Sequence, residues 1–351
     1  MKVSEKMNNP TSTAPNIFDY ATGELSQDAF LAWLAMWADE KYKGIDLDLN
    51  TVARNFLVSL CENKISNSDI DTVSVKLQYK KTDVLIDITS NTPAVRPQLI
   101  VIEDKTGSGT HSQQLERYKE AISEQLEPGG DFENYEVHYI YFKTEDHITH
   151  EADLHGFNDF SRQKALSILA SPTGLSVKNQ IFIDYITRLK RIEKESQDYI
   201  GLPHENWRYP QWSGFMMALC KELGGDANFG YVPNASGGFI GAWFGWTTIE
   251  GMTDNDELYL QMGWAPGSVF DLKLRVGSPD RESTERLKQL VLPILRTKFD
   301  NSQTDYSSKN IRKGRSVALI SFEGLNISEE NNKVAVFASK VREILSAIKD
   351  S

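Results

Sequence analysis

Two runs of apolar residues near the start of the chain follow the spacing of amphipathic helices. In the first run, apolar side chains stand at i, i+3, i+4 and i+7, namely at Phe30, Trp33, Leu34 and Trp37. This spacing places them on one helical face. The second run predicts a helix over 49–63, with Asp48 or Asn50 available to cap its N-terminus.

Beyond residue 70 the period changes from that of helices to that of strands. Residues 70–79 alternate between apolar and polar, 83–88 read DVLIDI and 98–103 read QLIVIE, with polar or proline-containing breaks between them. The last of these segments is almost entirely apolar, which predicts a central strand. A helix over 111–126 and a fourth strand over 136–143 follow, so the predicted order is helix, three strands, helix, strand.

The remainder of the chain predicts a connector and a second domain. Residues 160–199 look helical and end in a charged, solvated run. Beyond residue 200, a short helix, several apolar strand segments and two further helices predict an α+β domain. Because 351 residues fit two domains, we expect a first domain over 1–160 with its core at about 24–143, a helical connector over 161–199 and an accessory domain over 200–351.

The cysteines and the apolar content indicate the compartment. Cys61 and Cys220 each lie inside an apolar helical pattern, so we expect two core thiols, no disulfide framework and a reducing environment. The first fifteen residues are polar, and no stretch approaches 18 uncharged apolar residues. These features predict a cytoplasmic protein with no membrane segment.

The charge balance argues against a protein that coats nucleic acid. The formal net charge is -11, whereas phosphate binding is driven mainly by Lys and Arg. The excess of acid lies in the first 200 residues, which hold 21 basic and 31 acidic side chains. Residues 273–315 carry eleven Lys or Arg against five acids, so this stretch predicts either ordinary solvated helix faces or a local basic surface for contact with nucleic acid.

A group of charged residues at strand ends carries the candidate chemistry. Glu103 and Lys105 are two residues apart, so both side chains point to one face of the strand end. If the preceding strand is an antiparallel neighbour, Asp83 at its start can reach Glu103. Two carboxylates, with the backbone carbonyl of Asp104 as a further ligand, suit Mg²⁺, which also takes waters and a substrate phosphate.

Such a site fits phosphodiester hydrolysis. A metal can neutralise charge on the phosphate, activate the attacking water and stabilise the leaving oxygen. The ammonium group of Lys105 can orient the water or stabilise the additional negative charge in the transition state. We therefore expect removal of Lys105 to lower the rate more than binding.

These residues resemble the D…(D/E)xK motif of the PD-(D/E)XK nucleases, with Asp83 followed by Glu103-Asp104-Lys105. Gln114 and Tyr118 match the Q-x-x-x-Y element that follows the core strand in one large branch of this superfamily. Glu24, which opens the first helix, is similar to the upstream acid that often joins the metal site in that branch.

The resemblance covers about residues 24–143 and carries several implications. It implies an α/β fold with a restriction-endonuclease-like αβββαβ core, followed here by the C-terminal α+β accessory domain. It implies a Mg²⁺-dependent nuclease acting on DNA, with Mn²⁺ able to substitute. The implied catalytic residues are Asp83, Glu103, Lys105, Gln114 and Tyr118, and the implied metal ligands are Asp83, Glu103, the Asp104 carbonyl and Glu24.

The sequence departs from the family pattern before Asp83, where Lys81-Thr82 replaces the leading proline. Asp87 shares the strand face of Asp83, so either aspartate could be the ligand; we prefer Asp83 because it opens the apolar strand. The main alternative function is a catalytically inactive binding or regulatory protein with the nuclease fold. Dimerisation would help to cut both strands of a duplex, but nothing in the sequence requires it.

Several of these residues can also be explained by ordinary structural roles that involve no catalysis. An acid-x-lysine tripeptide alone is common as a weak surface ion pair. Tyr118 fits a core position, Gln114 a solvated helix position, and Glu24 an acid favoured by the helix dipole. Five of the seven Trp residues lie between 207 and 264, where they can form the core of a second sheet or stack on unpaired bases.

Overall fold

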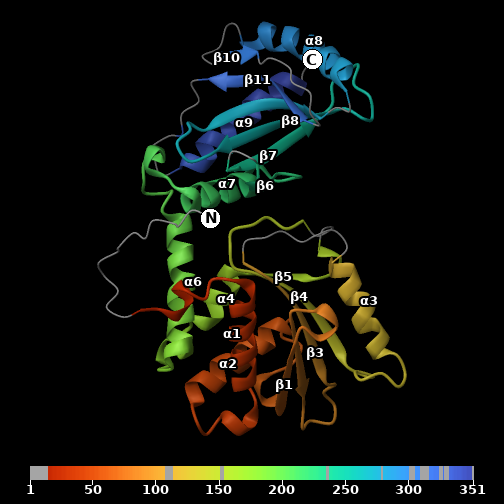
Figure 1. Cartoon of the computed structure of the whole chain (residues 1–351), viewed down its shortest axis with the longest axis vertical. Helices are drawn as coiled ribbons and strands as arrows, with labels where there is room; N and C mark the ends of the chain where they lie inside the picture. Colours follow the sequence, from red (N-terminus) through yellow and green to blue (C-terminus); the bar gives the residue numbers. More distant parts are fainter. Residues whose placement is uncertain are drawn as a thin grey trace. The chain divides into compact units, whose positions relative to one another are not determined.

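The computed structural model describes residues 15–106, 114–150, 154–234, 237–277, 280–299, 305–308, 316–323, 327 and 332–349. The chain separates into two compact units, which are described one at a time (Figure 1). The first unit comprises Met1–Glu145 and Glu151–Glu193, and the second comprises Asp146–His150 and Lys194–Ser351. The helices over 161–199 therefore belong to the first unit as far as Glu193.

The first unit is built on a five-stranded mixed sheet in the order β1-β2-β3-β4-β5. Its strands are β1 (Thr72–Leu77), β2 (Val84–Thr89), β3 (Gln98–Lys105), β4 (Glu136–Lys143) and β5 (Asn158–Ser161). Its helices are α1 (Glu24–Trp37), α2 (Leu47–Leu60), α3 (Gln114–Leu126), α4 (Arg162–Leu169), α5 (Pro172–Ser176) and most of α6 (Gln180–Gln197). β1 to β3 pair antiparallel, whereas β3, β4 and β5 are parallel.

The predicted order of elements is confirmed, and β3 is the central strand. Side chains of β3 alternate between two cores. Ile100 and Ile102 pack with α1 and α2 on one face, whereas Leu99 and Val101 pack against Ile122 of α3 on the other. Figure 1 shows α3 on the side of the sheet opposite α1 and α2. This burial on both faces explains the nearly continuous apolar sequence of the strand.

The structure corrects two details of the sequence interpretation. Asp46, rather than Asp48 or Asn50, caps α2, because its Oδ1 accepts a hydrogen bond from the Leu49 N–H at 3.0 Å. Asn50 instead donates to the backbone carbonyl of Trp37 at 2.7 Å. The strand β5 was not predicted, because its four residues contain a single apolar side chain and show no period.

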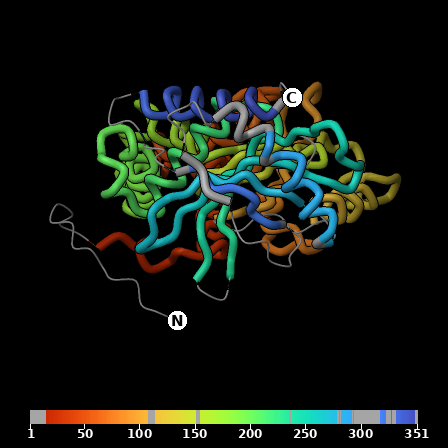
Figure 2. Tube along the Cα trace, turned by 90° about the horizontal axis from the view of Figure 1, so that it is seen from above, coloured from red at the N-terminus to blue at the C-terminus, as the bar shows by residue number. Residues whose placement is uncertain are grey.

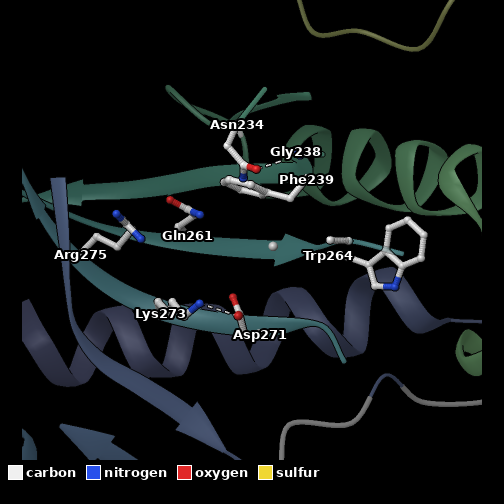
Figure 3. Close-up of a pocket in the computed structure, with 10 residues that line it drawn as sticks. Asn234, Gly238, Phe239, Gln261, Trp264, Asp271, Lys273 and Arg275 are labelled. Atoms are coloured by element: carbon white, nitrogen blue, oxygen red, sulfur yellow. Dashed lines mark hydrogen bonds and ion pairs between the residues drawn. The ribbon is translucent and has the colours of Figure 1, made fainter. Parts of the chain in front are cut away.

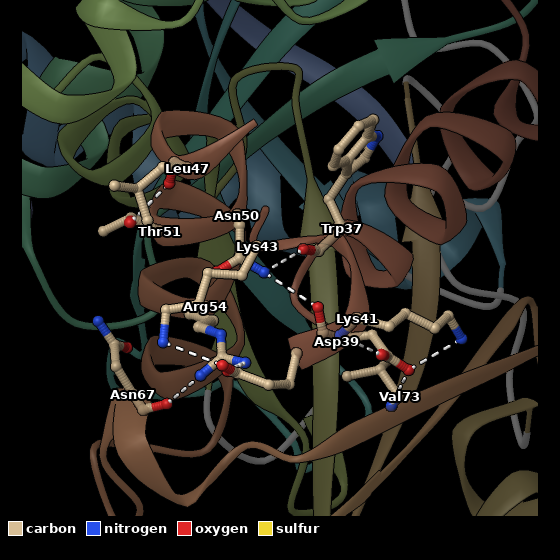
Figure 4. A network of polar contacts seen from close by, with 11 residues as sticks. Trp37, Asp39, Lys41, Lys43, Leu47, Asn50, Thr51, Arg54, Asn67 and Val73 are labelled. Atoms are coloured by element: carbon tan, nitrogen blue, oxygen red, sulfur yellow. Dashed lines mark hydrogen bonds and ion pairs between the residues drawn. The ribbon is translucent and has the colours of Figure 1, made fainter. Parts of the chain in front are cut away.

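A network of polar contacts holds the C-terminal end of α1 against α2 and β1 (Figure 4). Asp39, which follows α1, accepts a hydrogen bond from the Val73 N–H at 3.1 Å. Asn50 donates to the Asp39 carbonyl at 3.1 Å, and the buried guanidinium of Arg54 donates to the Asn67 carbonyl at 2.8 Å. These contacts fix the direction of α1 and therefore the place of its first residue, Glu24.

The second unit contains a six-stranded antiparallel sheet in the order β10-β11-β9-β8-β7-β6. Its strands are β6 (Asn228–Val232), β7 (Phe239–Thr247), β8 (Glu257–Trp264), β9 (Asp271–Gly277), β10 (Asp305–Ser308) and β11 (Ser316–Glu323). Its helices are α7 (Tyr209–Leu223), α8 (Arg281–Phe299) and α9 (Lys333–Lys349). The α+β class is confirmed, but β6 and β10 were not predicted.

The three helices of the second unit supply one hydrophobic core with the sheet. Phe215 of α7, Leu287 of α8 and Phe337 of α9 belong to the same cluster as Leu258 and Leu260 of β8. Figure 2 shows α9, in dark blue, running along one side of the strands. The helices therefore cover one face of this sheet.

Both cysteines lie in the hydrophobic cores. Cys61 and Cys220 are both free and buried, as the sequence predicts. Burial raises the pKa of each thiol to about 12. Within the described segments, no helix combines the length and the apolar character needed to cross a membrane.

Candidate active site

The candidate site lies at the C-terminal end of β3. Glu103 and Lys105 point to the same face of the sheet as Val101, and their exposed fractions are 0 % and 6 %. Asp83 directly precedes β2, whose antiparallel register pairs Val84 with Ile102 and so places Asp83 opposite Glu103. The Asp83 Oδ2 accepts a hydrogen bond from the Asp104 N–H at 2.9 Å. The predicted approach of Asp83 to Glu103 is therefore present.

The Glu103 carboxylate is buried and poorly solvated. It forms a close ion pair with the Lys105 ammonium group, but within the described residues neither of its oxygens accepts a well-formed hydrogen bond. Burial, and then the negative charge of Asp83, raises the pKa of Glu103 to about 8, although Lys105 acts in the opposite direction. The site therefore holds a carboxylate that needs a cation to remain ionised at neutral pH.

Lys105 provides one such positive charge. Burial alone would lower the pKa of Lys105, but the carboxylates of Glu103, Asp83 and Glu24 raise it above its ordinary value. The ammonium group also donates to the Asp104 carbonyl at 3.1 Å. Lys105 is therefore charged, and it is held between the acids and the end of the strand.

Helix α3 brings the predicted Gln114 and Tyr118 to the same face of the sheet. The Gln114 side-chain amide donates to the Tyr118 hydroxyl at 2.7 Å. Tyr118 is buried, and burial together with the negative charges of Glu103 and Asp83 raises its pKa to about 12. The Tyr118 hydroxyl therefore remains protonated next to the two carboxylates.

The upstream acid and the alternative aspartate occupy different places. The Glu24 Oε2 lies 3.8 Å from the Lys105 Nζ, so the start of α1 reaches this end of β3. Asp87 pairs with Leu99 in the β2–β3 register, four residues from Asp83, and its Oδ2 lies 3.4 Å from the Ser74 hydroxyl. The structure thus brings Asp83, and not Asp87, beside Glu103.

The sequence interpretation did not include a buried polar layer on the opposite face of β3. The Gln27 amide donates to Asp104 Oδ1 at 2.6 Å and its carbonyl accepts from the Thr144 hydroxyl at 3.1 Å. Burial, and then the charge of Asp83, raises the pKa of Asp28 to about 6. Burial also raises the pKa of Asp104. The sequence did indicate these two residues, because Gln27 and Asp28 follow Glu24 at i+3 and i+4 and therefore lie on the same helical face.

Lys143 is a second residue that the sequence interpretation did not include. It ends β4 and pairs with Lys105 in the parallel register, so both lysines lie on one face. Its exposed fraction is 9 %, and burial lowers its pKa. Lys143 could not be found from the sequence, because its position beside Lys105 depends on the register between β3 and β4.

The donor set fits a hard divalent cation supported by substrate and water. Among the residues that the structure describes, no three His, Cys, Asp or Glu side chains form a cluster that could hold a metal ion. Asp83, Glu103 and the Asp104 carbonyl offer two carboxylates and one neutral oxygen. Mg²⁺ commonly uses one or two carboxylates and retains several waters. The two Glu103 oxygens without hydrogen-bond donors are consistent with that use.

Comparison with known proteins identifies the family. The model of the PD-(D/E)XK nuclease superfamily matches residues 15–200, more than half of the chain. The protein therefore belongs to this superfamily, and its first unit has the restriction-endonuclease-like core. Searches of the curated proteins and of the solved structures gave no match.

Proposed function

We propose that the protein is a metal-dependent nuclease that hydrolyses phosphodiester bonds of DNA. The observation that carries this proposal is the buried Glu103 carboxylate beside Asp83, in contact with Lys105. Burying a charge is costly, and here the single ammonium group of Lys105 faces the carboxylates of both Glu103 and Asp83, so the arrangement points to a site that binds a further cation. Membership of a nuclease superfamily supports the same conclusion.

Asp83, Glu103 and the Asp104 carbonyl would hold Mg²⁺, for which Mn²⁺ would substitute, with Glu24 adjoining through Lys105. A metal bound there supplies charge neutralisation at the scissile phosphate and activation of water. The Asp104 N–H donates to the Oδ2 atom of Asp83 and fixes its position. This hydrogen bond does not occupy the Oδ1 atom. The chain thus orients the carboxylate before any ligand arrives.

Lys105, Tyr118 and Gln114 would act on the substrate side. The Lys105 ammonium group would stabilise negative charge that develops on the phosphate and orient the attacking water. The hydrogen bond from Gln114 holds the Tyr118 hydroxyl in place, and its raised pKa keeps that hydroxyl able to donate to a phosphate oxygen. Lys143, aligned with Lys105, adds positive charge on the same face.

The test is cleavage of supercoiled plasmid and of labelled single-stranded DNA in Mg²⁺ or Mn²⁺, with an EDTA control. We expect metal-dependent cutting that Glu103→Gln abolishes. Glu120→Gln, the same change at an exposed position of α3, is the matched control and should cut like the wild type. Undiminished cutting by Glu103→Gln would overturn the proposal.

A second candidate function is a non-catalytic binding protein that retains the nuclease fold. The acidic net charge of -11 favours it, because nucleic-acid substrates are polyanions. This candidate predicts no binding of Mg²⁺ or Mn²⁺ that depends on Asp83 and Glu103. Calorimetric titration of the wild type and of the double variant Asp83→Asn/Glu103→Gln separates the two functions.

The proposal also includes a cytoplasmic location, on the ground of two buried free thiols. A homodimer would place two sites on a duplex. Sedimentation of the protein with and without DNA measures the oligomeric state.

A further inference from the structure

The face of the second sheet opposite its hydrophobic core carries a mixture of aromatic and polar side chains. Strand alternation directs Leu258 and Leu260 of β8 into the core and Tyr259 and Gln261 to the other face. The same alternation places Phe239 and Trp243 of β7, and Lys273 and Arg275 of β9, on that outer face. The six side chains of this group belong to three adjacent strands.

A cavity of about 310 Å³ lies on this face (Figure 3). Its lining includes the ring of Phe239, the amides of Asn234 and Gln261, and the charged groups of Lys273 and Arg275. The volume is at the lower end of the range for ligand sites, about 300 to 1,000 Å³. The cavity thus offers an aromatic ring, amide groups and two cations to one small ligand.

Two glycines allow the aromatic rings to lie against the sheet. Gly241 and Gly263 stand opposite each other on β7 and β8. A Cβ on Gly241 would lie 2.9 Å from the Phe239 ring and 3.2 Å from the Trp243 ring, and a Cβ on Gly263 would lie 3.5 Å from Phe239. Glycine inside a strand weakens the sheet and often marks a close approach. Here it lets the Phe239 ring pack over the backbone beneath the cavity.

Polar groups next to this ring are already oriented. The Trp243 indole N–H donates to the Gln261 side-chain oxygen at 3.3 Å, which turns the amide nitrogen of Gln261 away from Trp243. Lys273 forms an ion pair with Asp271, and Arg275 follows two residues later on the same face. The lining therefore carries two positive charges against one negative charge.

Aromatic contacts continue beyond the cavity on the same face. Tyr259 pairs with Arg275 in the β8–β9 register, and the rings of Tyr259 and Trp246 stack with their centroids 5.4 Å apart. Trp246 retains an exposed fraction of 38 %. Tyr259 itself is only 7 % exposed, so Trp246 is the ring of this pair that a base can reach. A face with one ring at the cavity and another outside it suits a chain of bases better than a single free nucleotide.

We propose that this face binds an unpaired nucleic-acid strand, with one base against Phe239 and adjacent phosphates at Lys273 and Arg275. The faces of bases are covered in a duplex, so only an unpaired strand can present them to an aromatic ring. Gln261 would contact the edge of the base. This inference deepens the proposed function, on which it rests for the class of substrate, but the binding itself needs no metal.

The test is binding of labelled 12-nucleotide dT and rU strands to the full chain in EDTA, over a series of salt concentrations. We expect Phe239→Leu to weaken binding about tenfold with an unchanged salt dependence, because only stacking is lost. Arg275→Gln should weaken binding and reduce the slope of log K against log salt by about 0.7, because one phosphate contact is lost. Phe239→Tyr should bind like the wild type.

Lys221→Gln is the matched control, because it removes one charge from an exposed position of α7, on the helical side of the sheet. It should retain the affinity of the wild type. Equal binding by Phe239→Leu, Arg275→Gln and the control would overturn the inference. So would tighter binding of a 12-base-pair duplex, or competition by thymidine monophosphate as strong as that by the strand.

The failure of this inference can be distinguished from the failure of the proposed nuclease. EDTA removes the metal, so the binding of the strand is measured independently of metal-dependent cleavage. Loss of strand binding in Phe239→Leu and Arg275→Gln would support the inference whether or not the protein cuts DNA.

Discussion

Glu103 combines full burial with a raised pKa and a lysine partner, and perturbed ionisable groups of this kind concentrate at functional sites. The residues around Glu103 lie on both faces of β3. Asp83, Lys105 and Tyr118 surround it on one face, whereas Gln27 holds Asp104 on the other. The orientation of this strand end, where we propose that catalysis occurs, therefore also depends on Gln27 on the opposite face.

Lys105 gives the first prediction at the scale of single residues. Lys105→Met keeps the length of the side chain but removes the charge, so we predict a fall in the cleavage rate of about 100-fold or more. Metal affinity should stay the same or rise, because an ammonium group next to the ligands is gone. Cleavage rates and calorimetry measure the two effects, with the exposed Lys43→Met as control. A parallel loss of metal binding would contradict this role.

Glu103 gives a prediction about pH. Its pKa is raised from 4.5 to about 8 in the folded protein, so between these values the folded state binds more protons than the unfolded state. The contribution of Glu103 to the free energy of unfolding is therefore complete below about 4.5 and decreases as pH rises towards 8, by at most about 1.4 kcal/mol per pH unit.

Urea denaturation of the metal-free protein at pH 5, 6, 7 and 8 measures this slope. Glu103→Gln should make the slope less negative than in the wild type. The same slope in both proteins would show that Glu103 titrates normally in the folded state.

At the scale of elements, the periods of the sequence predicted most of both sheets. β3 and β4 stand out because apolar residues run through them, as in QLIVIE. β6 and β10 did not, because NFGYV includes a glycine and DYSS is almost wholly polar. Such short strands are stabilised by their neighbours in the sheet, and that information is not local.

The sequence predicted those residues of the candidate site that lie close together along the chain. The order of Asp83, Glu103 and Lys105 along two adjacent strands was sufficient to bring them together. Lys143 and Asp28 could not be assigned in the same way. Lys143 depends on the register of β4, and Asp28 depends on how α1 packs against β3.

The corrected N-terminus of α2 provides a prediction at this scale. Asp46→Ala removes the side chain that accepts the Leu49 N–H, so we predict a loss of about 1 kcal/mol in the free energy of unfolding. Asp48→Ala, in the first turn, removes only an interaction with the helix dipole and should cost less than about 0.5 kcal/mol. Equal losses in denaturant titrations of the two variants would contradict the assignment of the cap.

At the scale of the whole molecule, each unit has a hydrophobic core of its own. Ile102 belongs to the core of the first unit and Phe337 to that of the second. We predict two transitions in calorimetric unfolding. Ile102→Ala should lower one of them and Phe337→Ala the other, each by a destabilisation of about 2 to 5 kcal/mol. A single transition that both variants shift equally would contradict separate cores.

We propose that Asp83 and Glu103 together form the metal site of a nuclease. The clearest experiment is the single-turnover rate of DNA cleavage as a function of Mg²⁺ concentration for Asp83→Asn and Asp87→Asn, identical changes directly before β2 and within it. We expect Asp83→Asn to abolish metal-dependent cleavage and Asp87→Asn to cut like the wild type. Normal cleavage by Asp83→Asn, or equal loss in both variants, would contradict it.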